Sequence, residues 1–190
     1  MLADLPPWST AYLFVLGLSF YYFTLAGART FEVNPGDETP SGIAQFSFLV
    51  TGTIGTLFLN VGKPLPLSNA LVSATLLLAA LALYEWARDV IRGRGFHLAW
   101  TGDVPDALCD EGPYRLVRHP LYSSYILTFL AVAVAYPGPI SLTILVCNLG
   151  LFVHAAITDE RSLARSDLAS EYAAYKARTG MFLPRLNASK

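Results

Sequence analysis

The sequence predicts an all-α integral membrane protein with five transmembrane helices, the last two forming a tight hairpin, followed by a cytoplasmic C-terminal amphipathic helix. Three observations predict this class. The 190 residues are 54% hydrophobic and only 14% charged, whereas soluble domains carry about 25% charged residues. Five apolar stretches approach the length of about 20 residues that a spanning helix needs. Lysine and arginine are also very unevenly divided among the segments that connect these stretches.

Charge and cysteine content exclude several other classes. The formal net charge is −1, from 13 basic and 14 acidic residues, so nucleic-acid binding through an overall basic field is not expected. Two cysteines are too few for a disulfide scaffold. Disordered chains have a low apolar content, so the high apolar content of this chain excludes disorder.

The five predicted spans contain no internal charge except Glu85, near the end of the third. The spans are Trp8–Leu25, Ile43–Val61, Ser68–Trp86, Leu121–Tyr136 and Pro139–Ile157. A signal peptide is the alternative for the first span, but no basic residue precedes it, and we expect it to be retained. Only Pro137-Gly138-Pro139 joins the fourth span to the fifth, which predicts a helical hairpin.

The distribution of positive charge predicts the orientation. With five crossings, twelve of the thirteen lysines and arginines lie on one side and Lys63 alone lies on the other. Positively charged loops face the cytoplasm. We therefore expect the N-terminus outside and the C-terminus in the cytoplasm, in a bacterial inner membrane. We also expect two parts, residues 1–86 with three helices and residues 87–190 as the catalytic, cofactor-binding region.

Charged residues gather where the predicted hairpin returns to the cytoplasmic side. Pro120 suits the first position of the fourth helix, which makes His119 its N-cap. This helix start and Arg118 favour an anionic group. The fifth helix is expected to end near Thr158, so Asp159 and Glu160 follow it directly and favour a cation.

Antiparallel packing would bring these opposite charges together, which suits a small zwitterion such as an α-amino-acid head group. The alternative is that Arg118 and Glu160 pair with each other and only complete two helix ends. His119 is equally plausible as an ordinary interfacial histidine, and His154 is expected to extend toward the interface.

The segment from Asp159 to Thr179 is predicted to be one amphipathic helix that lies on the membrane surface or caps a cavity beneath it, with Gly180 as its C-cap. The three histidines lack the spacing of a metal site, and no phosphate-binding loop or nucleophile elbow is present. We therefore expect no metal.

Two ordered motifs flank the hairpin and carry a resemblance. The first runs from Gly112-Pro113-Tyr114 through Arg118-His119-Pro120-Leu121-Tyr122. The second begins at Asp159-Glu160, continues through Glu171-Tyr172-x-x-Tyr175-Lys176 and ends at Leu183-Pro184. Together they resemble the isoprenylcysteine carboxyl methyltransferase and phospholipid methyltransferase superfamily, over roughly residues 95–186.

The resemblance implies a membrane enzyme that uses S-adenosylmethionine, and it implies which residues hold this cofactor. The implied cofactor-binding residues are Tyr114, Arg118, His119, Pro120, Tyr122, Asp159, Glu160, Glu171, Tyr172 and Tyr175. Arg118, Tyr122 and Glu160 are the implied catalytic residues. The methionyl end of this cofactor is a zwitterion of the kind inferred above.

The expected reaction is methyl transfer to a lipophilic, membrane-resident acceptor, as in O-methylation by isoprenylcysteine carboxyl methyltransferases. The chain differs from the family pattern at Ser124 and Asp159, and it has Ala155-Ala156-Ile157 where eukaryotic carboxyl methyltransferases place arginines. The alternatives are an NADPH-dependent sterol-reductase-like enzyme, whose motif usually has asparagine at the position of Pro120, and a non-enzymatic membrane binding protein.

Overall fold

A computed structural model describes residues 6–30, 50, 53–92 and 108–185. Within these residues the fold is helical. The long helices are α1 (Pro7–Thr30), α3 (Leu67–Ile91), α4 (Pro120–Ala135) and α5 (Pro139–Leu163). Shorter elements are a 3-10 turn, η1 (Gly112–Arg115), the helix α6 (Ala169–Arg178) and a helical segment over residues 53–60.

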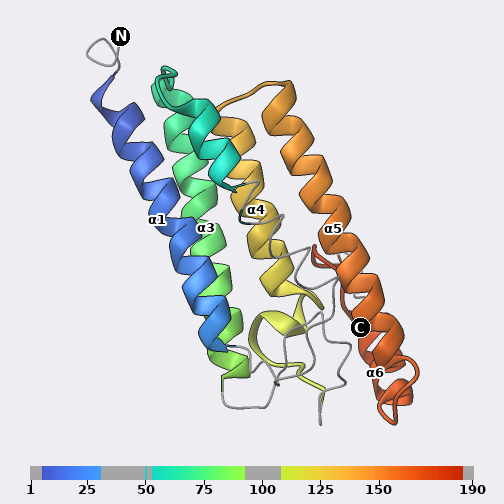
Figure 1. Ribbon diagram of the computed structural model, residues 1–190. Coiled ribbons are helices and arrows are strands. Elements are labelled where there is room, and N and C mark those ends of the chain that lie inside the picture. Colours follow the sequence, from blue (N-terminus) through green and yellow to red (C-terminus); the bar gives the residue numbers. More distant parts are fainter. Residues whose placement is uncertain (1–5, 31–49, 51–52, 93–107, 186–190) are drawn as a thin grey trace.

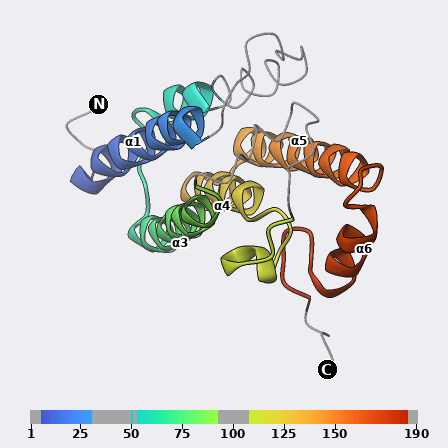
Figure 2. The same ribbon diagram turned by 90° about the horizontal axis from the view of Figure 1, so that it is seen from below.

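The long helices lie side by side as one bundle, with α6 at the end opposite the α4–α5 connection (Figure 1). Figure 2 shows α4 between α3 and α5, and α4 packs against both of them. Hydroxyl groups tie three helices together inside the bundle: Tyr12 on α1 contacts Ser73 on α3, and Ser73 donates to the carbonyl of Ala131 on α4 at 2.5 Å. Buried polar groups need such partners.

Three described helices are long and apolar enough to cross a membrane: residues Pro7–Ala26 of α1, α3 and α5. The shorter α4 is also apolar. These four helices coincide with four of the five predicted spans. Of the predicted span Ile43–Val61, residues 43–49 and 51–52 lie outside the described residues, so the number of five spans stays a prediction.

The predicted hairpin is confirmed, because α4 ends at Ala135 and α5 begins at Pro139. His119 is the N-cap of α4 and Pro120 occupies its first turn, also as predicted. Proline tolerates this position because its missing N–H would have no helical partner there.

The predicted end of the fifth helix is wrong. α5 continues past Thr158 through Asp159 and Glu160 to Leu163, and a turn over residues 164–168 separates it from α6. The expected single helix from Asp159 to Thr179 is therefore two helices. The break falls at Ser166, whose hydroxyl donates to the Leu163 carbonyl and accepts from the Leu168 N–H. Serine competes with the helical hydrogen bonds in this way.

Gly180 is not the helix C-cap that the sequence suggests. Thr179 is the C-cap and has extended backbone angles. Gly180 instead forms an isolated parallel β-bridge with Val117. A Cβ atom at Gly180 would lie 1.7 Å from the Leu183 carbonyl oxygen, so the close turn of the following chain requires glycine.

Candidate functional site

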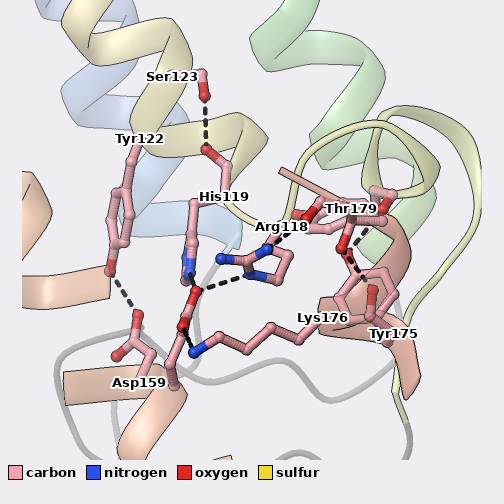
Figure 3. Close-up of polar contacts among 10 residues, drawn as sticks. Arg118, His119, Tyr122, Ser123, Asp159, Tyr175, Lys176 and Thr179 are labelled. Carbon is pink, nitrogen blue, oxygen red and sulfur yellow. Dashed lines mark hydrogen bonds and ion pairs between the residues drawn. The ribbon is translucent and has the colours of Figure 1, made fainter. Parts of the chain in front are cut away.

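The candidate site is a polar cluster at the end of the bundle where α4 begins and α5 ends. We use the name polar cluster for six residues that come from these two helices, the residue pair before α4, and α6. They are Arg118, His119, Tyr122, Asp159, Glu160 and Lys176. Figure 3 shows the side chains of five of them, Arg118, His119, Tyr122, Asp159 and Lys176, gathered in one place.

Glu160 is the centre of the polar cluster. Its side chain is only 5% exposed, yet three basic groups surround it. Arg118 Nε lies 2.7 Å from Oε1, Lys176 Nζ lies 2.6 Å from Oε2, and His119 Nε2 lies 3.4 Å from Oε1. A buried carboxylate is costly unless it is paired in this way. The sequence left open the alternative that Arg118 and Glu160 only pair with each other at two helix ends. The direct Arg118–Glu160 contact is the one that this alternative requires.

A second acidic contact lies next to this one. The hydroxyl of Tyr122 donates to Asp159 Oδ2 at 3.0 Å (Figure 3). The imidazole of His119 stacks on the Tyr122 ring, with the ring centroids 5.4 Å apart and the planes 12° apart. Burial lowers the pKa of His119, and the nearby Glu160 carboxylate opposes this effect. The neutral imidazole is therefore favoured.

The segment after α6 closes over the start of α4. The N–H groups of Arg118 and His119 donate to the carbonyls of Gly180 and Met181 at 2.8 and 3.1 Å. Arg118 Nη1 also donates to the Thr179 carbonyl at 2.5 Å, and Ser123 Oγ donates to the Phe182 carbonyl at 3.0 Å. These contacts fix the Arg118 side chain and hold residues 179–182 beside the polar cluster.

The other residues predicted to hold the cofactor lie outside the polar cluster. Tyr114 and Tyr175 are buried beside the polar cluster, where the Tyr175 hydroxyl donates to the Tyr114 carbonyl at 2.7 Å. Tyr172 is also buried, whereas Glu171 is exposed in the first turn of α6 and makes no ion pair within the described polar cluster. Pro120 contributes backbone geometry, as the first residue of α4.

Sequence reasoning missed Lys176 as a site residue. It lies inside the tyrosine-containing tail motif, but a half-exposed lysine on an amphipathic helix has no sequence signal that separates it from a solvated one. It also missed Thr179 and residues 180–182, which act through backbone carbonyls. Backbone groups carry no residue-type signal at all.

The residues present fit an amino-acid head group. Opposite charges lie side by side at a helix start. Two buried polar atoms make no well-directed hydrogen bond to the described residues: the Tyr172 hydroxyl, and His119 Nε2, whose contact with Glu160 Oε1 is 3.4 Å long. Such atoms are rare in folded proteins and mark places where a further ligand or water is expected. Groups of His, Cys, Asp or Glu that could hold a metal ion are absent from the described part of the chain.

Taken together, the helical bundle and the polar cluster define a membrane-embedded protein with a charged site at one boundary of its apolar core. Comparison with known proteins gives the family. Residues 69–166 match the phospholipid methyltransferase family, and this match covers more than half of the chain. The chain belongs to this family, as the two motifs predict.

The chain is also similar to a methanethiol S-methyltransferase of Pseudomonas sp. (strain GM41(2012)). The two sequences are 32% identical over 94 residues, which make up 48% of this chain and 35% of the relative. The matched segment therefore spans about one third of that relative's length.

Proposed function

We propose that this chain transfers a methyl group from S-adenosylmethionine to a lipophilic acceptor within the membrane. The observation that carries this proposal is the buried Glu160 carboxylate between Arg118, His119 and Lys176, where α4 begins and α5 ends. Membership of the phospholipid methyltransferase family and the similarity to a methanethiol S-methyltransferase support the reaction class.

In this proposal each residue of the polar cluster has a distinct role. Glu160 would hold the ammonium group of the methionyl moiety, which would take over a contact that Lys176 now makes. Arg118, together with the N-terminus of α4 and His119, would hold its carboxylate. Lys176 is suited to exchange because its side chain is 50% exposed, whereas that of Arg118 is 6% exposed.

S-adenosylmethionine, when bound, supplies a methyl group already activated by a positive sulfur, so its transfer needs alignment and exclusion of water more than a metal or a nucleophilic side chain. Aromatic rings beside the polar cluster serve this need. Tyr122 and Phe152 stack with their centroids 5.7 Å apart, and Phe182 lies against His119 at 6.0 Å. Ring faces attract a cation and exclude water. Asp159 accepts a hydrogen bond from the Tyr122 hydroxyl and so holds the Tyr122 ring in place.

A separate cavity supports a lipophilic acceptor. It has a volume of about 260 Å³ and lies among α1, residues 50–57 and α4. Two of its three threonines, Thr24 and Thr128, donate their hydroxyls to carbonyls of their own helices, both at 2.9 Å, so these hydroxyls add little polarity to the walls. Apolar cavities of this kind bind hydrocarbon rather than water. The aromatic and aliphatic side chains of the lining are Phe20, Tyr21, Phe23, Val50, Ile54, Leu57, Tyr125 and Phe129.

Tyr125 connects this apolar cavity to the polar cluster. Its ring lies 5.5 Å from that of Phe152, which in turn stacks on Tyr122. A hydrocarbon chain in the apolar cavity would thus lie two ring contacts from Tyr122. For the acceptor atom we propose a carboxylate oxygen, as in isoprenylcysteine carboxyl methyltransferases. A carboxylate needs no general base. Glu160 is already paired with Arg118 and Lys176, and Asp159 accepts a hydrogen bond from Tyr122.

Calorimetric titration of the purified protein with S-adenosylhomocysteine and with NADPH tests the cofactor. We expect binding of S-adenosylhomocysteine only. Binding of NADPH instead would favour a reductase, and binding of neither would favour a non-enzymatic membrane protein.

Incubation of a lipid extract with a radiolabelled methyl donor tests the acceptor atom. A methyl ester releases its label as methanol in mild alkali, whereas S-methyl and N-methyl products keep it. We expect alkali-labile label in the lipid fraction. Alkali-stable label would contradict methylation of a carboxylate oxygen but not methyl transfer.

A further inference from the structure

A second cavity lies at the end of the bundle opposite the polar cluster. It has a volume of about 360 Å³, within the range of small-molecule pockets. Residues 56–69 form one wall, and the α4–α5 turn with the start of α5 forms the other. Figure 1 shows this turn and the start of α3 at the end away from α6. We call it the distal cavity.

Two helix starts border the distal cavity. α3 begins at Leu67 after Pro66, and α5 begins at Pro139 after Gly138; neither start has a side-chain capping hydrogen bond. The first N–H groups of a helix lack helical partners and carry partial positive charge. Two uncapped starts at one cavity therefore favour an anion.

The side chains of the distal cavity add one unsatisfied donor and one cation. Tyr136 lines it and is 6% exposed, and its buried hydroxyl has no hydrogen-bond partner among the described residues. Lys63 lines it as well, and its ammonium donates to Asn60 Oδ1 at 3.1 Å. Carboxylates are absent from the described residues that line this cavity. The positive charge of Lys63 is thus without an acidic counterpart there.

The surroundings indicate that the anion is attached to apolar chains. Leu59, Ile140 and Ile144 also line the distal cavity, so a large part of the wall is hydrocarbon. Beside it, Trp8 at the start of α1 donates its indole N–H to the Leu65 carbonyl at 2.9 Å. Tryptophan and tyrosine collect at the level of lipid head groups. Residues at the starts of the apolar helices α3 and α5 line the distal cavity.

We propose that the distal cavity binds the phosphate group of an anionic phospholipid, with Lys63, the Tyr136 hydroxyl and the starts of α3 and α5 as its donors. The 16 residues of α4 separate this site from the polar cluster, a distance of about 24 Å at 1.5 Å per residue. The bound lipid is therefore not the acceptor at the polar cluster. The proposal of this lipid site does not depend on the proposed methyl transfer.

Native mass spectrometry of the delipidated protein in non-ionic detergent tests this site. Phosphatidylglycerol is the probe, and diacylglycerol with the same chains, which lacks the phosphate, is the comparison. We expect one tightly bound phosphatidylglycerol and weak binding of diacylglycerol. Lys63→Gln should weaken phosphatidylglycerol binding at least fivefold, and Tyr136→Phe, which keeps the ring, should weaken it at least threefold.

Arg165→Gln is the matched control, because Arg165 is an exposed cation at the opposite end of the bundle. It should leave phosphatidylglycerol binding unchanged. Thermal melting of each variant shows whether it is folded. Equal phosphatidylglycerol binding by folded Lys63→Gln and Tyr136→Phe would overturn the proposal. So would equal binding of diacylglycerol, or competition by inorganic phosphate at the same concentration as the lipid.

Discussion

Glu160 shows how a residue can be both buried and charged at the boundary of an apolar bundle. Its carboxylate lies in the last turn of α5, where the partial negative charge of the helix end opposes it. Arg118 and Lys176, from distant parts of the sequence, offset this cost with contacts of 2.7 and 2.6 Å. The same contacts let α5 continue through the acidic pair, which the local sequence alone did not predict.

The chain offers two ion pairs for a direct comparison at the residue scale. Arg118–Glu160 is almost fully buried, whereas both side chains of Arg178–Asp110 are more than half exposed. Removing one partner of a buried pair leaves an unpaired charge and costs about 3–5 kcal/mol. Arg118→Gln should therefore lower the free energy of unfolding by about 3 kcal/mol, and Arg178→Gln by less than about 1 kcal/mol.

Denaturation in mixed detergent micelles measures both variants. Equal losses of stability would show that burial of the Arg118 pair has no energetic consequence, contrary to the account of the polar cluster given above.

His119 predicts a pH dependence of stability. Because burial lowers the pKa of His119 in the folded protein, the unfolded chain binds the proton more readily below the ordinary histidine pKa of about 6.5. This residue's contribution to stability is present above about pH 6.5 and is lost as the pH falls. Between pH 7.5 and 5, the melting temperature should fall more steeply for the wild type than for His119→Gln. An equal fall of the melting temperature in both proteins would contradict the lowered pKa of His119.

At the scale of elements, the segment after α6 depends on Gly180. Gly180→Ala would place a Cβ atom 1.7 Å from the Leu183 carbonyl oxygen and displace the chain that pairs with Arg118 and His119. Such overpacking costs about 1–3 kcal/mol. Gly150→Ala is the matched control, since a Cβ atom there meets no atom within 4 Å and alanine favours a helix by up to about 1 kcal/mol.

Thermal melting and S-adenosylhomocysteine titration of both glycine variants check this expectation. Gly180→Ala should lose stability and weaken ligand binding, while Gly150→Ala should retain both. A Gly180→Ala protein with unchanged melting and binding would show that residues 179–182 do not support the polar cluster.

The sequence predicted the elements whose signals are local. Pro120 marked the start of α4, and the prolines around Gly138 marked the hairpin. Features that depend on tertiary contacts were predicted wrongly. The helix α5 runs to Leu163, and Gly180 allows a close approach of the backbone instead of capping a helix. Arg118, Tyr122 and Glu160 could be chosen from motif and charge, but Lys176 could not, because its role exists only once α6 packs beside α5.

At the scale of the whole molecule, the uneven distribution of positive charge predicts the topology. Lys63 and Arg165 should lie on opposite sides of the membrane, with Arg165 in the cytoplasm. In a variant whose native Cys109 and Cys147 are replaced by alanine, a membrane-impermeant maleimide should label Lys63→Cys in intact cells. It should label Arg165→Cys only after lysis. Labelling of both positions in intact cells would contradict five crossings with an internal C-terminus.

The proposed division into residues 1–86 and residues 87–190 also belongs to this scale. It stays a prediction, and the family match begins at residue 69, within α3. α3 packs against α4, so the catalytic part we propose would depend on a helix of the first part for its packing.

The polar cluster as the cofactor site is the central claim, and calorimetric titration with S-adenosylhomocysteine tests it most directly. Glu160→Gln removes the carboxylate charge with little change in shape, whereas Asp167→Asn neutralises an exposed acid between α5 and α6. We predict that Glu160→Gln weakens binding at least tenfold, which corresponds to about 1.4 kcal/mol, and that Asp167→Asn binds as the wild type does. Wild-type affinity in a folded Glu160→Gln protein would contradict the claim.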